Sequence, residues 1–84
     1  MQDKYIAPEV QEMMNKLKKS VDDIMTDLEK AKLFPERKED IMEQVELITF
    51  VMDTLFVENN LAELEKSFIY MESLRLNIPH WEKP

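Results

Sequence analysis

The sequence predicts an all-α protein: an antiparallel three-helix bundle with two long, heptad-patterned helices and one shorter helix. Two observations indicate this fold. Apolar residues recur at alternating gaps of four and three, and the 84 residues include no glycine. Alternating gaps of four and three align apolar side chains along one seam of a helix. Glycine supplies the positive φ angles of tight hairpin turns, so a β-rich fold is hard to build without it.

The first helix is expected near residues 8–32, because Pro8 suits the first helical turn and Pro35 disfavours helical backbone at the residue before it. Gaps of four and three run through its whole apolar seam, which consists of Val10, Met14, Leu17, Val21, Ile24, Leu28 and Ala31. This seam predicts packing against a neighbouring helix along the full length.

The second helix is expected near residues 36–58. Its seam has the same spacing and consists of Ile41, Val45, Ile48, Met52 and Leu55. A further apolar set makes its later half apolar nearly all round: Leu47, Phe50, Val51, Phe56 and Val57. Such a helix is central in a bundle or covered by another subunit. We expect the third helix to cover Leu47 and Val51, and a second molecule to shield Phe50 and Val57.

The third helix is expected near residues 60–78. Asn60 is a good N-cap, with Glu63 three residues later, and Pro79 is expected to end the helix. Its apolar residues are Leu61, Leu64, Phe68, Met71, Leu74 and Ile78. The short tail 79–84 contains the only tryptophan, Trp81. That side chain is expected to fold back on the bundle as a lid, or else to anchor a partner.

Composition limits the possible chemistry of this single domain. The chain has no cysteine and one histidine, His80, so disulfides, thiolate sites and an all-protein zinc site are not expected. Residues 1–5 lack the basic start and apolar run of a secretory signal. The most apolar stretch, 47–57, contains Asp53 and is too short to span a bilayer. We therefore expect a cytoplasmic protein that does not interact with membranes.

The charge is strongly acidic and uneven. The formal net charge is −7, and residues 35–59 carry seven acidic against two basic residues. Phosphate backbones repel such a chain, so nucleic acid is not an expected partner. The one basic cluster, Lys16, Lys18 and Lys19, is followed at once by Asp22 and Asp23. No small-molecule substrate or cofactor is expected either.

The acids of the second helix suggest one enzymatic alternative. Glu36-Arg-Lys-Glu39 and Glu43-Gln-Val-Glu46 resemble the E-x-x-E motif of all-helical nucleotide pyrophosphohydrolases. That resemblance implies a magnesium site, but the companion E-x-x-D motif is absent from the sequence. Metal ligands must converge from more than one element. The preferred interpretation is a solvated acidic face, and no catalytic, cofactor or metal-binding residue is predicted.

Surplus apolar surface is the remaining functional indication. It favours a small acidic protein-binding regulator or adaptor, of the kind made by bacteria or phage, that binds a different protein or forms a homodimer. A symmetric pairing is expected to bury the interface candidates of both later helices together. These candidates are Phe50, Val57, Ile69, Tyr70 and Leu76, and Trp81 of the tail is a further interface candidate. The alternatives are a minimal metal-dependent enzyme using the second-helix carboxylates and a secretion chaperone.

Overall fold

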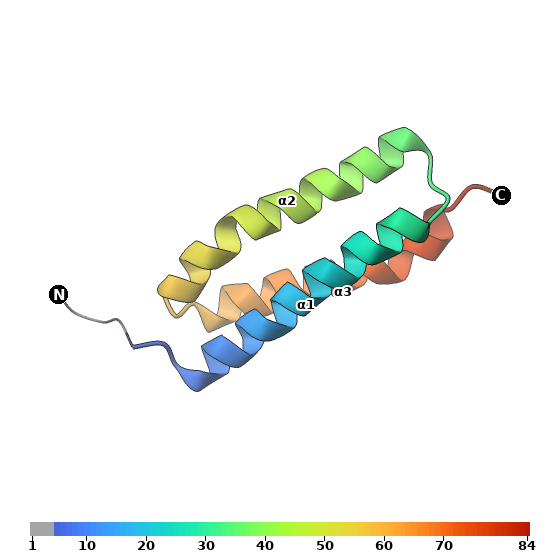
Figure 1. Cartoon of the computed structure of the whole chain (residues 1–84). Coiled ribbons are helices and arrows are strands. Elements are labelled where there is room, and N and C mark those ends of the chain that lie inside the picture. Colours follow the sequence, from blue (N-terminus) through green and yellow to red (C-terminus); the bar gives the residue numbers. More distant parts are fainter. Residues whose placement is uncertain (1–4) are drawn as a thin grey trace.

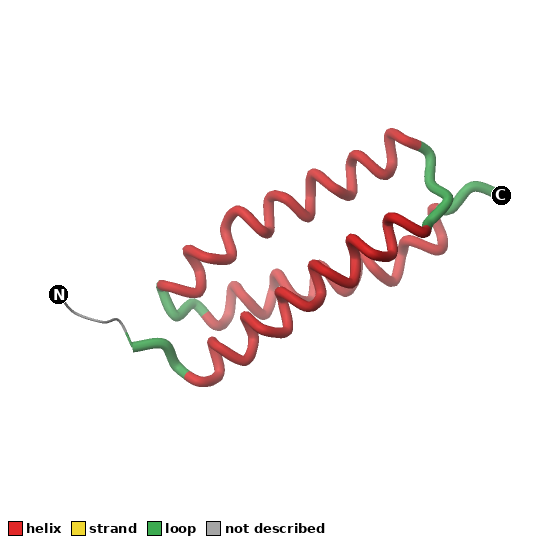
Figure 2. The backbone as a smooth tube through the Cα atoms, in the orientation of Figure 1, coloured by secondary structure: helices red, strands yellow, loops and turns green. Residues whose placement is uncertain are grey.

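The computed structural model describes residues 5–84, and helices make up most of that range. They are α1 (Pro8–Lys30), α2 (Pro35–Val57) and α3 (Leu61–Trp81), joined by short connections at opposite ends of the molecule (Figures 1 and 2). The described range contains no strand. Residues 1–4, where no secretory signal was found in the sequence, lie outside it. The predicted all-α three-helix bundle is confirmed.

Consecutive helices run antiparallel, so α1 and α3 run parallel to each other (Figure 1). Contacts between α1 and α3 keep a nearly constant sequence separation, as parallel helices require. Ser20 bonds Glu72, 52 residues away, and Asp27 bonds Arg75, 48 residues away. α1 packs more extensively on α3 than either helix packs on α2. The bundle is elongated, with extents of 54 × 19 × 17 Å.

The core follows the predicted seams, and α1 contributes more residues to it than either of the other helices. The buried apolar residues of the whole core are Val10, Met14, Leu17, Ile24, Leu28, Leu33 from the first connection, Ile41, Val45, Met52, Leu64, Met71, Leu74 and Ile78. Ile48 and Leu55 are only half-buried and pack at its margin. Of the three α2 residues that continue the predicted seam into the later half of the helix, Met52 alone is therefore fully buried. α2 is the least embedded of the helices because it packs less closely on its neighbours.

The helix ends show how a chain without glycine turns. Pro8 and Pro35 open α1 and α2, where a missing N–H removes no helical hydrogen bond. After α2, Asn59 takes the left-handed conformation that glycine usually provides, with φ 55°. The Asn60 N–H donates to the Leu55 carbonyl at 2.9 Å, and the Asn59 N–H donates to the carbonyl three residues back at 3.0 Å. This is a Schellman ending built on asparagine.

The N-cap prediction for α3 is confirmed. The Asn60 side chain accepts a hydrogen bond from the Glu63 N–H at 3.2 Å. This bond satisfies one of the amide donors that the first turn of a helix leaves without a helical partner.

α3 ends later than predicted, because Pro79 does not stop it. The helix continues through Pro79 to Trp81, so it has 21 residues against 23 in each of the others and is barely shorter. Pro79 removes the hydrogen bond to the Arg75 carbonyl and crowds that carbonyl, and both effects are confined to the last turns of the helix. The following tail is held to the α1–α2 connection, where the Lys83 N–H donates to the Lys32 carbonyl at 2.7 Å. The ends of α1 and α2 differ from expectation by one or two residues.

Candidate protein-binding surface

α2 has a second heptad seam on the side opposite to its buried one. We call it the outer seam. Its gaps alternate between four and three, and its members, all exposed, are Glu36, Asp40, Glu43, Leu47, Phe50, Thr54 and Val57. Phe50 lies two residues from buried Met52, which places it about 160° away around the helix. Phe50 is 75%, Leu47 67% and Val57 52% exposed. Two of the predicted interface residues, Phe50 and Val57, therefore lie in solvent on one line of α2.

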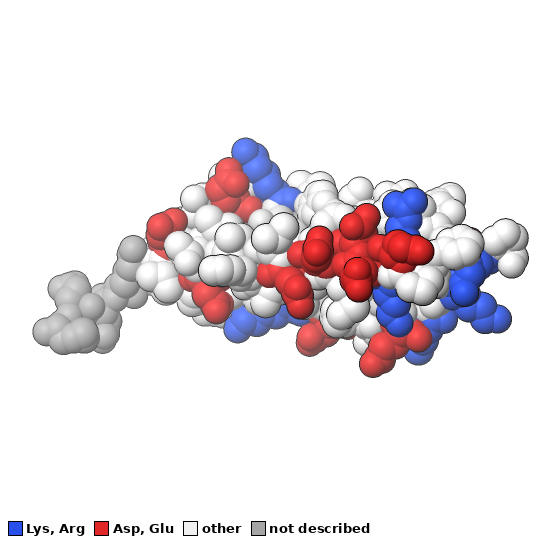
Figure 3. Space-filling view, turned by 90° about the horizontal axis from the view of Figure 1, so that it is seen from above, with Lys and Arg blue, Asp and Glu red and all other residues white. Residues whose placement is uncertain are grey.

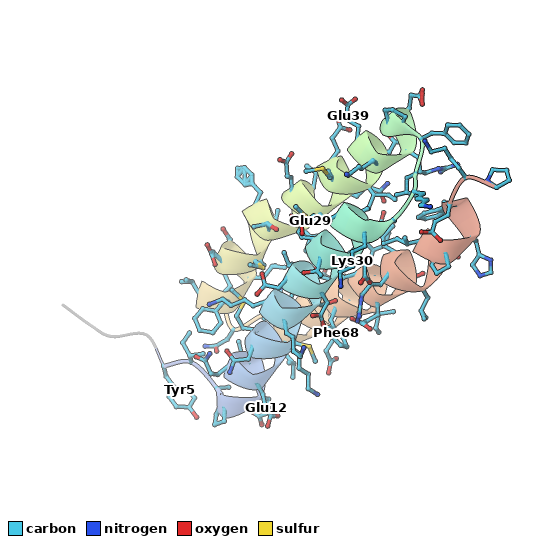
Figure 4. All side chains as sticks on the ribbon, turned by 45° about the vertical axis from the view of Figure 1, so that its right-hand side comes forward. Tyr5, Glu12, Glu29, Lys30, Glu39 and Phe68 are labelled. Carbon is cyan, nitrogen blue, oxygen red and sulfur yellow. The ribbon has the colours of Figure 1, made fainter. Side chains whose placement is uncertain are left out.

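The outer seam is divided along its length. Its first three positions are acidic and its last four are apolar or threonine. Viewed from the α2 side, acidic side chains gather over the first half of the helix, and the next stretch is mostly uncharged (Figure 3). Glu39, beside the seam, projects away from the other helices (Figure 4). This face therefore presents carboxylates at one end and apolar side chains at the other.

Leu47 and Val51 do not pack under α3, which corrects the prediction that the third helix covers them. They are 67% and 46% exposed. The boundary between α2 and α3 is instead marked by a polar pair, in which the Tyr70 hydroxyl donates to the Gln44 side chain. Gln44, Leu47 and Val51 are three and four residues apart and share one side of α2. The Gln44–Tyr70 pair lies at the solvent-exposed edge of the α2–α3 contact. Leu47 and Val51, on the same side of α2, therefore remain exposed to solvent.

Apart from Tyr70, the exposed large apolar residues of α3 are Ile69 and Leu76, which form a separate strip, lie seven residues apart and are 66% and 75% exposed. Each precedes a buried residue, Met71 or Ile78, by two positions and so points away from the core. α2 and α3 occupy different corners of the bundle, so the two strips face different directions. A flat contact that covers the outer seam leaves the α3 strip in solvent.

Trp81 lies at the end of the bundle, half-buried against the core. The Arg37 guanidinium lies 5.0 Å from the centroid of its ring, an arrangement that favours cation–π attraction. Nearby, the Lys83 ammonium lies 5.6 Å from the Phe34 ring centroid, and the Lys32 N–H donates to the Glu82 carboxylate at 3.2 Å. Trp81 thus covers one end of the bundle and differs from Phe50, Val57, Ile69 and Leu76, which are each more than half exposed.

A polar cluster that the sequence interpretation missed crosses from α1 to α3. Arg75 Nε donates to Asp27 at 2.9 Å, and its Nη1 lies 3.7 Å from Asp23 and 3.9 Å from Glu72. The hydrogen bond to Asp27 raises the pKa of Arg75 above its ordinary value. The hydroxyl of buried Ser20 donates to Glu72 at 2.6 Å. Because Glu72 and Arg75 of α3 bond residues of α1, the cluster links the two helices.

One signal could have revealed part of this cluster. Ser20 is three residues after Leu17 and four before Ile24, so it borders the apolar seam of α1. A small residue at such a position allows two helices to approach closely. Its partner on α3 could not be read from that spacing.

The start of the described chain is held against the turn between α2 and α3. The Ala7 N–H donates to the Asn59 side-chain oxygen at 2.9 Å, and the Asn59 amide nitrogen donates to the Tyr5 carbonyl. Asn59 therefore shapes the turn with its backbone and binds the segment before α1 with its side chain.

The remaining findings concern metal ligands, membrane-spanning helices and similarity to known proteins. Among residues 5–84, no group of three or more histidine or acidic side chains is arranged to hold a metal ion. In the same range, no helix combines the length and apolarity needed to cross a membrane. His80 is exposed on the last turn of α3. Comparison with protein-family models, curated proteins and solved structures gave no match.

Proposed function

We propose that this chain is a small protein-binding regulator or adaptor, and that its main binding surface is the apolar half of the outer seam. The exposure of Phe50, Leu47 and Val57 along one line of α2 is the observation that supports this most directly. A contiguous line of large apolar side chains in solvent is a common mark of interaction sites. Phe50, with three quarters of its surface exposed, is the central anchor.

The free energy of burying these apolar side chains limits how tightly this surface alone can bind a partner. Complete burial of such a side chain contributes about 1.5–3 kcal/mol, or about 1–2 kcal/mol when scaled by the fraction still exposed here. The three anchors together come to about 3–6 kcal/mol. Association costs about 4–15 kcal/mol in lost freedom. The apolar half therefore needs further contacts to hold a partner, which suits reversible binding.

A photo-crosslinking amino acid at position 50 tests the proposal in cells that naturally make this protein. The expected result is a covalent adduct with one discrete partner band. The same amino acid at position 18, where Lys18 is exposed on α1, is the control and is expected to give no such band. The absence of any protein adduct from position 50 would refute the function. Calorimetric titration with Mg²⁺ or Mn²⁺ tests the metal-dependent enzyme as the alternative.

Self-association is the other form that this binding can take. Sedimentation equilibrium at micromolar concentration decides it, because a homodimer has twice the 10.1 kDa mass of the chain. If the outer seam is the dimer contact, Phe50→Ser returns the protein to a monomer. Ile69→Ser, which changes the α3 strip, is the matched control and leaves such a dimer intact.

A further inference from the structure

We infer that the outer seam of α2 binds an amphipathic helix of a different protein, one that carries lysine or arginine at one end and apolar residues at the other. This inference rests on the proposed function and names the class of partner. It follows from three properties of the seam: its spacing, the division of its chemistry and the poor fit of a second copy.

The spacing favours a helical occupant. Alternating gaps of four and three over residues 36–57 are the pattern that one helix presents to another running alongside it. The buried seam of α2 has the same pattern and packs on α1 and α3. At about 1.5 Å per residue the outer seam is about 32 Å long, enough for six helical turns of a partner.

The division of the seam specifies the chemistry of that helix and its direction. Leu47, Phe50 and Val57 call for apolar side chains opposite them. Glu36, Asp40 and Glu43 require cationic side chains opposite them. The centres of the acidic and apolar groups lie about 15–20 Å apart along the helix, a distance set by the helical rise. The acidic half, residues 35–43, carries four acidic residues against Arg37 and Lys38. A partner helix with its basic end over the wrong half would lay charges on apolar surface, so the seam selects one direction of binding.

The junction between the acidic and apolar halves of the outer seam contains both kinds of side chain. A shallow hollow there is lined by Glu43, Glu46, Leu47 and Phe50. A long basic side chain suits these four residues. Its hydrocarbon stem covers the apolar pair, and its charged head reaches a carboxylate. Lysine or arginine at the matching position of the partner helix would therefore bind both halves of the seam at once.

A second copy of this chain fits poorly in either direction. In a parallel pairing of two outer seams, Glu36, Asp40 and Glu43 of one copy face the same acids of the other. In an antiparallel pairing, those acids face Phe50 and Val57 and lose water without gaining a partner. Each copy also carries a net charge of −7, which opposes approach. Charge complementarity thus favours a basic partner.

A displayed library of 21-residue helical peptides tests the inference. Four positions at one end of the peptide seam vary among Leu, Ile, Val and Met, and three at the other end vary among Lys, Gln and Glu. Selection on the wild-type protein, with prior removal of binders to Phe50→Ser, is expected to enrich lysine at all three charged positions. Enrichment of Glu or Gln, no charge preference, or no peptide retained above the Phe50→Ser background would overturn the inference.

Affinity of an enriched peptide then separates charge at the seam from total charge. Neutralising the seam with Glu36→Gln, Asp40→Asn and Glu43→Gln is expected to weaken binding about tenfold at low salt, and the difference should shrink at high salt. The control triple variant Glu12→Gln, Glu29→Gln and Glu65→Gln changes net charge equally at exposed positions of α1 and α3. Equal weakening by both triple variants would overturn the inference.

The two proposals fail separately. A discrete adduct from position 50, together with peptides that show no charge preference, would leave the binding function standing and remove the basic partner helix. A homodimer that Phe50→Ser dissociates would likewise overturn the inference, since a second copy would then occupy the seam. No adduct from position 50 would remove the function itself.

Discussion

Replacing Asn59 by alanine or by glycine separates two roles of one side chain. Asn59 adopts the left-handed backbone conformation with φ 55°, and its side chain accepts a hydrogen bond from the Ala7 N–H at 2.9 Å and donates one to Tyr5. Asn59→Ala loses both hydrogen bonds and puts a poorly suited residue in the left-handed region. Asn59→Gly loses the same hydrogen bonds but suits that backbone conformation.

The magnitudes follow from those two roles. A left-handed conformation costs an ordinary residue about 1–2 kcal/mol, and asparagine less, because its side chain bonds locally. Each lost hydrogen bond costs about 0.5–1.5 kcal/mol, with the lower value suited to the exposed bond to Tyr5. We expect Asn59→Ala to lower the free energy of unfolding by about 2–3 kcal/mol and Asn59→Gly by about 1 kcal/mol. A domain of this size has about 4–13 kcal/mol in total.

Urea unfolding and thermal unfolding, each followed by far-ultraviolet circular dichroism, measure both changes. Tm should fall by about 10–20 °C for Asn59→Ala and by about 4–8 °C for Asn59→Gly. Asn15→Ala is the control, because Asn15 is exposed on α1 and, within residues 5–84, its side chain bonds only the nearby Gln11 side chain. Its effect should stay within about 0.5 kcal/mol. Equal losses for alanine and glycine at position 59 would refute the backbone argument, and no loss for glycine would refute the role of the side chain.

Further substitutions probe the two sides of α2 and the contact between α1 and α3. Met52→Ala should cost about 2–4 kcal/mol in urea unfolding because it leaves a cavity, whereas Phe50→Ser on the opposite side should change stability by less than about 0.5 kcal/mol. Ser20→Leu should cost about 1–3 kcal/mol in the same assay, since a larger side chain forces the closely packed helices apart. Arg75→Met should cost about 1 kcal/mol in low salt and less in high salt. Because the folded pKa of Arg75 is raised, its contribution is complete below the unfolded pKa and is lost only as pH rises through the folded value. The part of the stability difference between wild type and Arg75→Met that comes from ionisation of Arg75 should therefore not change with pH near neutrality.

Helix positions and most of the core could be predicted from the sequence because both depend on local periodicity. Pro8, Pro35 and Asn60 mark helix starts through their own backbone and side-chain chemistry. The burial of Leu17 and Ile24 follows from the angle of about 100° between successive residues of a helix. Pro79 was misread because proline ends a helix only where a missing hydrogen bond and a steric clash matter, and near a C-terminus little of the helix remains to disrupt.

The candidate surface was predicted only in part. The apolar surplus of α2 was visible in the sequence, and Phe50 and Val57 were chosen correctly as residues outside the core. Leu47 and Val51 were wrongly expected to lie under α3, since spacing along one helix does not say how closely a second helix approaches. The Gln44–Tyr70 pair, 26 residues apart in sequence, lies at that edge. Such pairs depend on the arrangement of helices in space.

The amino-acid sequence is sufficient to predict that this chain is helical, where its helices start and which line of each helix enters the core. Those properties come from interactions within a few residues, which periodicity and capping residues record. Only the packing of the three helices shows which surplus apolar residues stay in water, that Ser20 bonds Glu72 next to Arg75, and that Asn59 holds the segment before α1. These outcomes depend on contacts between residues about 50 positions apart. Such contacts are set by how three helices share a limited amount of buried surface, and no single helix carries that information.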